Sequence, residues 1–207
     1  MLARLLLLPL LTIGAGYTHV GGRAGIEVYR QLDSPIIDLV AEGDLDAPPA
    51  DVAAILLDYA HAQALSPHVV QSQVLRQGVY DLDVYQRLHL PVVSDRDFTL
   101  HVAHGRRGAA EWLRFFVDNR GGPPTQPHVV RVTLLNGGWD LVPTREGRAT
   151  HARYRVQIDL AGTIPRWMVS DGSARDLPVL FEGLRRQLRR HERSLSQNMA
   201  QPRPRRF

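Results

Sequence analysis

Apolar and polar residues alternate along most of this chain, which is the pattern of β-strands with one buried face. The pattern predicts strands at 25–32, 36–45, 69–76, 79–90, 98–104, 111–119, 129–135, 138–143 and 148–160. The last strand is the clearest, because Tyr154, Val156 and Ile158 alternate with charged or amide side chains. Asp33-Ser34-Pro35 reads as a turn, and Asn136-Gly137 as the turn of a hairpin.

Two segments have helical spacing instead. In the first, Asp46 is expected to cap a short helix that has Pro48 and Pro49 in its first turn. The second is the long segment 177–195, in which apolar residues recur every three or four positions and arginines fill most of the rest. Its apolar stripe consists of Leu177, Leu180, Phe181, Leu184, Leu188 and Leu195.

This order of elements predicts an α+β domain. The expected strands follow one another too closely for parallel crossovers, so the sheet should be antiparallel. Its apolar face and the stripe of the last helix both need cover, and each can bury the other. We therefore expect a curved antiparallel β-sheet wrapped around a long C-terminal α-helix, in one domain over residues 25–195 of the 207.

The two ends of the chain differ from this domain. Residues 1–16 have a basic start, an apolar run and small residues, which is the form of a secretory signal peptide. We expect export to the periplasm or medium; an uncleaved anchor or an early start codon would leave the chain membrane-tethered or cytoplasmic. Residues 196–207 are expected to form a disordered tail that is rich in proline and arginine.

Composition excludes some functions. The chain has no cysteine, and hence no disulfide and no cysteine-based metal site or nucleophile. Its net charge of +4 is mild, and the arginines form no stripe with interleaved aromatics, so nucleic acid is not an expected partner. The arginines of the last helix are expected to be a solvated face, with transient contact to an anionic membrane as the alternative. A monomer is expected.

Three motifs in order resemble the START lipid-transfer family, in particular its bacterial branch within the START-like/SRPBCC superfamily. They are 90–98 (LPVVSDRDF), 138–143 (GWDLVP) and 159–169 (DLAGTIPRWMV). The resemblance covers roughly 25–190 and implies a helix-grip fold with an apolar tunnel between sheet and helix. It also implies a lipid or other apolar ligand and no cofactor; relatives that cyclise aromatic rings share the fold. Leu160 stands where the family often has proline, and Gly172-Ser173 is a candidate hinge.

The strand phase and this resemblance together predict the pocket lining. The candidates are Val84, Gln86, Leu88, Leu100, Val102, His104, Phe115, Tyr154, Val156, Leu177, Phe181, Leu184 and Leu188. Gln86 is the polar residue within an apolar row, so it should have a partner, either in the protein or on a ligand. His104 is considered in the same way.

The search for catalytic motifs finds no G-x-S-x-G elbow, P-loop, H-E-x-x-H or dinucleotide fingerprint. His101 and His104 would point to opposite faces of a strand, so no metal site is expected from them. Asp95 and Asp97 are expected to hold the turn beside Arg96 by ion pairs. The leading hypothesis is binding, and transfer, of an apolar ligand. The alternatives are a cyclase-like or hydrolase-like enzyme and an interaction module with a filled core.

Overall fold

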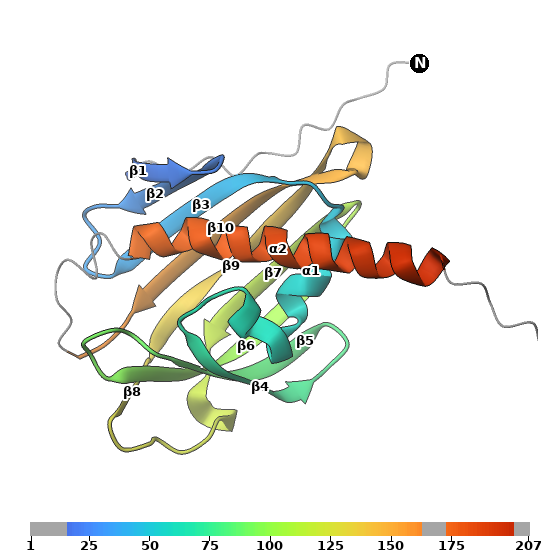
Figure 1. The fold of residues 1–207 in the computed structure, drawn as a ribbon. Helices are drawn as coiled ribbons and strands as arrows, with labels where there is room; N and C mark the ends of the chain where they lie inside the picture. Colours follow the sequence, from blue (N-terminus) through green and yellow to red (C-terminus); the bar gives the residue numbers. More distant parts are fainter. Residues whose placement is uncertain (1–15, 163–172, 201–207) are drawn as a thin grey trace, which may run out of the picture.

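The computed structural model describes residues 16–162 and 173–200, which form one large sheet and two α-helices (Figure 1). The strands are β1 (Tyr17–Arg23), β2 (Ile26–Gln31), β3 (Ile37–Leu45), β4 (Val69–Gln77), β5 (Asp81–Leu88), β6 (Asp95–Arg107), β7 (Ala110–Val117), β8 (Val129–Arg131), β9 (Leu134–Thr144) and β10 (Ala149–Asp159). The helices are α1 (Pro49–Leu57) and α2 (Ser173–Ala200), with 3₁₀ turns η1 (Tyr59–Ala64), η2 (Asn119–Gly121) and η3 (Arg145–Gly147). Both expected helices are present, and so are the expected strands except between residues 129 and 143.

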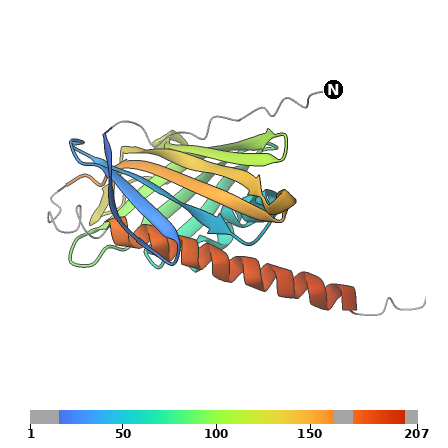
Figure 2. The ribbon, with the colours of Figure 1, turned by 90° about the horizontal axis from the view of Figure 1, so that it is seen from above.

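The sheet has the order β1-β2-β3-β10-β9-β7-β6-β5-β4, and neighbours along this path are antiparallel. The short strand β8 lies off the path and pairs with β6 in parallel. Helix α2 lies across one face of the sheet, as the view from above shows (Figure 2). The α+β class and the helix-grip arrangement expected from the sequence are confirmed.

Helix α2 is held by its apolar stripe. Leu177, Phe181, Leu184 and Leu188 are all buried and belong to one core cluster with the inner faces of β2 and β3. Each such side chain contributes about 1.5–3 kcal/mol by leaving water. Gly183 allows the helix to approach closely, because a Cβ there would lie 2.5 Å from the Leu65 carbonyl oxygen.

The predicted hairpin turn at Asn136-Gly137 is wrong. Both residues lie inside β9, and Gly137 pairs with Val156 on β10 and with Phe115 on β7. A Cβ on Gly137 would lie 2.1 Å from the Arg155 carbonyl oxygen, so glycine serves close strand packing here rather than a turn. The predicted strand 129–135 is accordingly divided between β8 and the start of β9.

Two other expectations change, and one strand is additional to those expected. Asp46 does not cap α1: the N-cap residue is Pro48, without a side-chain hydrogen bond, and Asp46 pairs with Arg145 at 2.7 Å. Helix α2 continues through residues 196–200, which the sequence analysis assigns to the disordered tail. Strand β1 begins directly after the proposed signal peptide and is absent from the predicted elements.

Several predictions fall on residues outside the described ranges. They concern the signal peptide at 1–16 apart from Gly16, most of the third START-like motif at 159–169, Gly172 of the candidate hinge, and the tail from residue 201. These remain predictions.

Candidate functional site

A cavity of about 410 Å³ lies between the sheet, the α1–η1 segment and α2. This volume falls within the range of small-molecule sites, roughly 300–1,000 Å³. Most of the residues around it are apolar. The lining consists of Ile37, Leu39, Leu56, Asp58, Tyr59, Ala62, Leu65, Ser66, His68, Val69, Gln86, Leu88, Leu90, Pro91, Phe98, Leu100, Phe115, Leu135, Trp139, Tyr154, Val156, Ile158, Leu160, Asp176, Leu177 and Leu180.

The sheet supplies the larger wall of the cavity. On β10, Tyr154, Val156 and Ile158 face the cavity, and on β3 the residues Ile37 and Leu39 do so. The cavity lies between two apolar clusters, one under α2 and one on β5, β6 and β7. Tyr154 and Ile158 pack against both.

The rim of the cavity contains the charged lining residues. Asp58 and Asp176 are exposed, and His68 is partly exposed. His68 Nε2 lies 3.3 Å from Asp176 Oδ1, so this pair connects the segment before β4 with the first turns of α2. The other ring nitrogen of His68 lies 3.3 Å from the His89 carbonyl oxygen.

The interior contains neutral polar groups. Gln86 lines the cavity and donates from Nε2 to the Ser72 hydroxyl at 3.1 Å, so its amide has a partner within the protein. Tyr59 and Tyr154 also line the cavity. Burial raises the pKa of both hydroxyls far above the ordinary value for tyrosine, so both are protonated at neutral pH.

The structure brings about half of the predicted pocket residues to the cavity. Those at the lining are Gln86, Leu88, Leu100, Phe115, Tyr154, Val156 and Leu177. The others are Val84, Val102, His104, Phe181, Leu184 and Leu188, which lie outside the lining. The five residues other than His104 are buried in the core. Phe181, for example, packs on Trp139 at a ring distance of 5.2 Å. His104 is partly exposed near the end of β6.

Sequence reasoning missed the contribution of the α1–η1 segment. Leu56, Tyr59, Ala62 and Leu65 all line the cavity from this segment. Leu56 and Tyr59 have the helical spacing that identified α1, so the sequence could have predicted that both lie on one face of this segment. The kink at Asp58, after which η1 turns toward the sheet, has no comparable signal.

The aspartates of the first START-like motif form ion pairs, as expected, but only those of Asp95 lie beside the turn. Asp95 binds Arg87 at 2.7 Å and His89 at 2.9 Å, and Asp97 binds Arg131 at 2.6 Å. The Asp97 pair connects β6 with the parallel strand β8.

Arg96, between these two aspartates, is 1% exposed and donates to the carbonyl oxygens of Ser94, Leu160 and Ala161. It therefore connects β6 with the end of β10.

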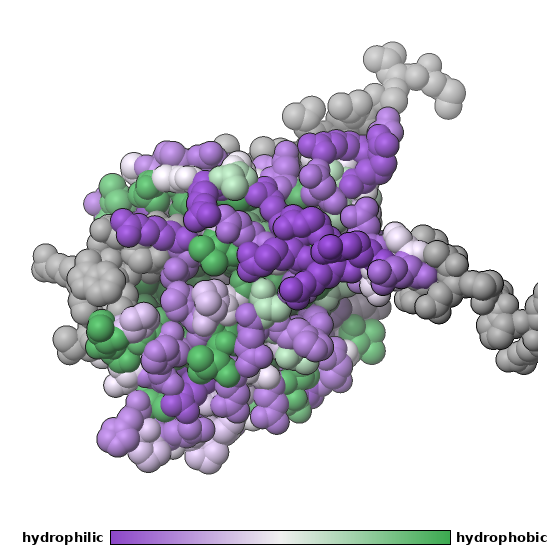
Figure 3. All heavy atoms as spheres, in the orientation of Figure 1, coloured by the Kyte–Doolittle hydropathy of each residue, from purple (hydrophilic) through white to green (hydrophobic). Residues whose placement is uncertain are grey.

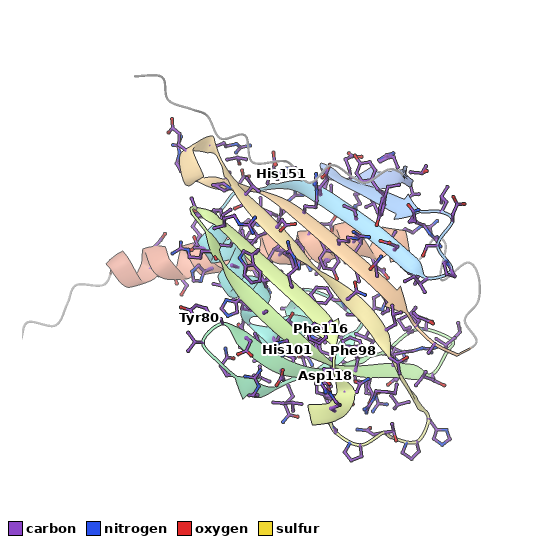
Figure 4. All side chains as sticks on the ribbon, turned by 180° about the vertical axis from the view of Figure 1, so that it is seen from behind. Tyr80, Phe98, His101, Phe116, Asp118 and His151 are labelled. Atoms are coloured by element: carbon purple, nitrogen blue, oxygen red, sulfur yellow. The ribbon has the colours of Figure 1, made fainter. Side chains whose placement is uncertain are left out.

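Histidines on the outer face of the sheet form surface contacts. Figure 4 shows His101 beside Phe116 on the side turned away from α2, and their rings are 5.2 Å apart. His101 Nδ1 also lies 2.8 Å from Asp83 Oδ1. Within the part of the chain that the structure describes, no three histidine or carboxylate side chains are grouped so as to hold a metal ion.

The outer surface of α2 is hydrophilic (Figure 3). Arg186, Arg189, Arg190 and Arg193 are exposed. Arg185 instead donates to the carbonyl oxygens of Ala24 and Asp44, at 2.7 and 2.8 Å, and so fixes α2 to the sheet. Across residues 16–162 and 173–200, no helix is long and apolar enough to span a bilayer.

Solved structures resemble this chain over most of its length. A STAR-related lipid transfer protein from Xanthomonas axonopodis is 26% identical, with a TM-score of 0.75, over 84% of this chain and 99% of that one. The chain has the helix-grip fold of these START-like proteins. Human STARD10, at 17% identity, has a TM-score of 0.78 over 93% of this START-like chain and 81% of its own. Human StAR-related lipid transfer protein 5, at 16%, has a TM-score of 0.76 over 86% and 88%.

The two human proteins support the fold of the START-like domain, and the Xanthomonas protein supports the bacterial resemblance as well. No family model and no curated protein sequence matches the chain.

Proposed function

We propose that this START-like domain binds a lipid or another largely apolar molecule in its cavity and carries it between surfaces. The observation that carries the proposal is the cavity itself: about 410 Å³, with apolar walls from the sheet and both helical segments. The name of the Xanthomonas relative, a lipid transfer protein, supports the same class of ligand.

Burial provides the binding energy. An apolar ligand that loses roughly 300 Å² of water-accessible surface gains about 7 kcal/mol, before the costs of immobilisation. We propose that the ligand enters by movement of α2 or of the neighbouring loops. The His68–Asp176 pair at the rim is one of the contacts that such a movement would break.

The test is to identify what the protein carries. The full chain is purified without detergent and extracted with organic solvent, and the extract is analysed by mass spectrometry. We expect a stoichiometric apolar molecule, and uptake of a fluorescent lipid by delipidated protein. Val156→Trp, which places an indole in the cavity, should abolish both. Val70→Trp is the matched control, because Val70 is exposed on β4.

Protein that is consistently empty and takes up no fluorescent lipid would contradict the proposal and favour an interaction module. Conversion of the bound molecule to a cyclised or hydrolysed product would instead support the enzyme alternative.

A further inference from the structure

Two tyrosine hydroxyls in the cavity lack a hydrogen-bond partner among the described residues. Tyr59 comes from η1 and Tyr154 from β10, so they approach the cavity from different walls. Two other tyrosines are bonded: Tyr17 donates to Asp38, and Tyr85 donates to Asp97 at 3.1 Å. Both tyrosine side chains are partly exposed and line the cavity, so a bound ligand can supply the partner that the protein does not.

The side chain of Tyr154 is well positioned. Its ring lies 4.6 Å from that of Trp139 and 6.1 Å from that of Phe115, which restricts its orientation. Both hydroxyls are protonated at neutral pH, so each can donate to an acceptor in the cavity that the two residues line.

The rest of the lining defines the charge of that acceptor. The charged lining residues, Asp58, His68 and Asp176, are at the rim, and two of them are acidic. No arginine is among the lining residues within the described ranges. An anionic or cationic headgroup in the interior would therefore be buried without a counter-ion, which is costly.

We propose that Tyr59 and Tyr154 together bind the carbonyl or hydroxyl oxygen of a neutral, otherwise apolar ligand. This rests on the proposed function and specifies its ligand class as neutral ketones, esters or alcohols. One such oxygen has two lone pairs and can accept from both hydroxyls.

The test compares ligands that differ in one group. Displacement of bound N-phenyl-1-naphthylamine is measured with 2-dodecanone and with 2-methyl-1-dodecene, which has CH₂ in place of the oxygen; both are delivered from cyclodextrin. The affinity for the ketone divided by that for the alkene should fall about tenfold from wild type to the double variant Tyr59→Phe/Tyr154→Phe. Each single variant should give an intermediate ratio. Comparing this ratio between wild type and variant cancels the different hydration of the two ligands, which is the same for both proteins. Tyr80→Phe, at an exposed tyrosine outside the lining, should leave the ratio unchanged.

Two results would overturn the tyrosine pair. One is an unchanged ratio in the double variant while its circular dichroism spectrum and its affinity for the fluorophore match wild type. The other needs no variant: wild-type protein that binds dodecanoate as tightly as 2-dodecanone. In both cases apolar binding would persist and the proposed function would stand. Failure of the fluorophore and of every ligand to bind wild-type protein would instead reject the proposed function.

Discussion

On the outer face of the sheet Asp97 accepts hydrogen bonds from Arg131 and Tyr85. In the cavity on the inner side, by contrast, the hydroxyls of Tyr154 on β10 and Tyr59 on η1 have no partner in the described structure. Asp38 resembles Asp97, since it is buried and binds Gln157 at 2.6 Å. These outer groups connect strands to one another. The inner groups face a cavity, so their hydrogen-bonding capacity remains available to a ligand.

The outer groups should therefore affect the stability of the fold, and the groups at the cavity should affect ligand binding. Removal of an outer carboxylate leaves a buried partner uncompensated, which lowers the free energy of unfolding. Removal of an inner hydroxyl leaves no protein group unpaired, and its effect should fall on the ligand. Three predictions test this separation.

The largest expected effect is that of Asp97→Asn. Asp97 is 1% exposed and its partner Arg131 is largely buried, so we expect a loss of about 3–5 kcal/mol in the free energy of unfolding. Urea titration measures it. Asp46→Asn is the control, because the Asp46–Arg145 pair is exposed and should contribute less than about 1 kcal/mol. Equal losses in the two variants would show that burial of the Asp97 pair has no special role.

Acidification should lower the free energy of unfolding through the outer carboxylates, by less than Asp97→Asn does. Hydrogen bonds from His89 and Arg87 hold the pKa of Asp95 below its ordinary value, and those from Arg76 and His101 do the same for Asp83. A carboxylate with a lowered pKa stabilises the fold above its unfolded pKa of about 4, and this contribution is lost as the pH falls through the folded value. The urea midpoint should therefore decrease below about pH 4. A midpoint that stays constant from pH 7 to pH 3 would be inconsistent with these pairs.

The smallest expected effect on stability is that of Tyr154→Phe. The ring keeps its contacts with Trp139 and Phe115, and the lost hydroxyl has no partner in the described structure. We expect a change of less than about 1 kcal/mol in the free energy of unfolding of ligand-free protein. A loss comparable to that of Asp97→Asn would mean that the hydroxyl supports the fold.

Much of the fold could be predicted because the alternation is regular. The inward rows of β3 and β10 were assigned to the correct face, as was the stripe of α2. Each row is long enough that a slip of one residue would put charged side chains into the core.

The failures have local causes. Asn136-Gly137 is a turn signal by residue type, yet Gly137 serves the close approach of β9 to Arg155 on β10. The cavity depends on tertiary packing: Leu177 and Leu180 of the α2 stripe reach the cavity, whereas Phe181 and Leu184 of the same stripe are covered by the core. Periodicity identifies which side chains point inward, and it does not show where the interior is left open.

The most direct test of the account is a binding isotherm of N-phenyl-1-naphthylamine with wild type, Val156→Trp and Val70→Trp. Wild type and Val70→Trp should bind one equivalent with similar affinity, and Val156→Trp should bind at least about tenfold more weakly, because an indole occupies the space between β10 and α2. Unchanged binding in folded Val156→Trp would place the ligand elsewhere and contradict the assignment of the cavity as the site.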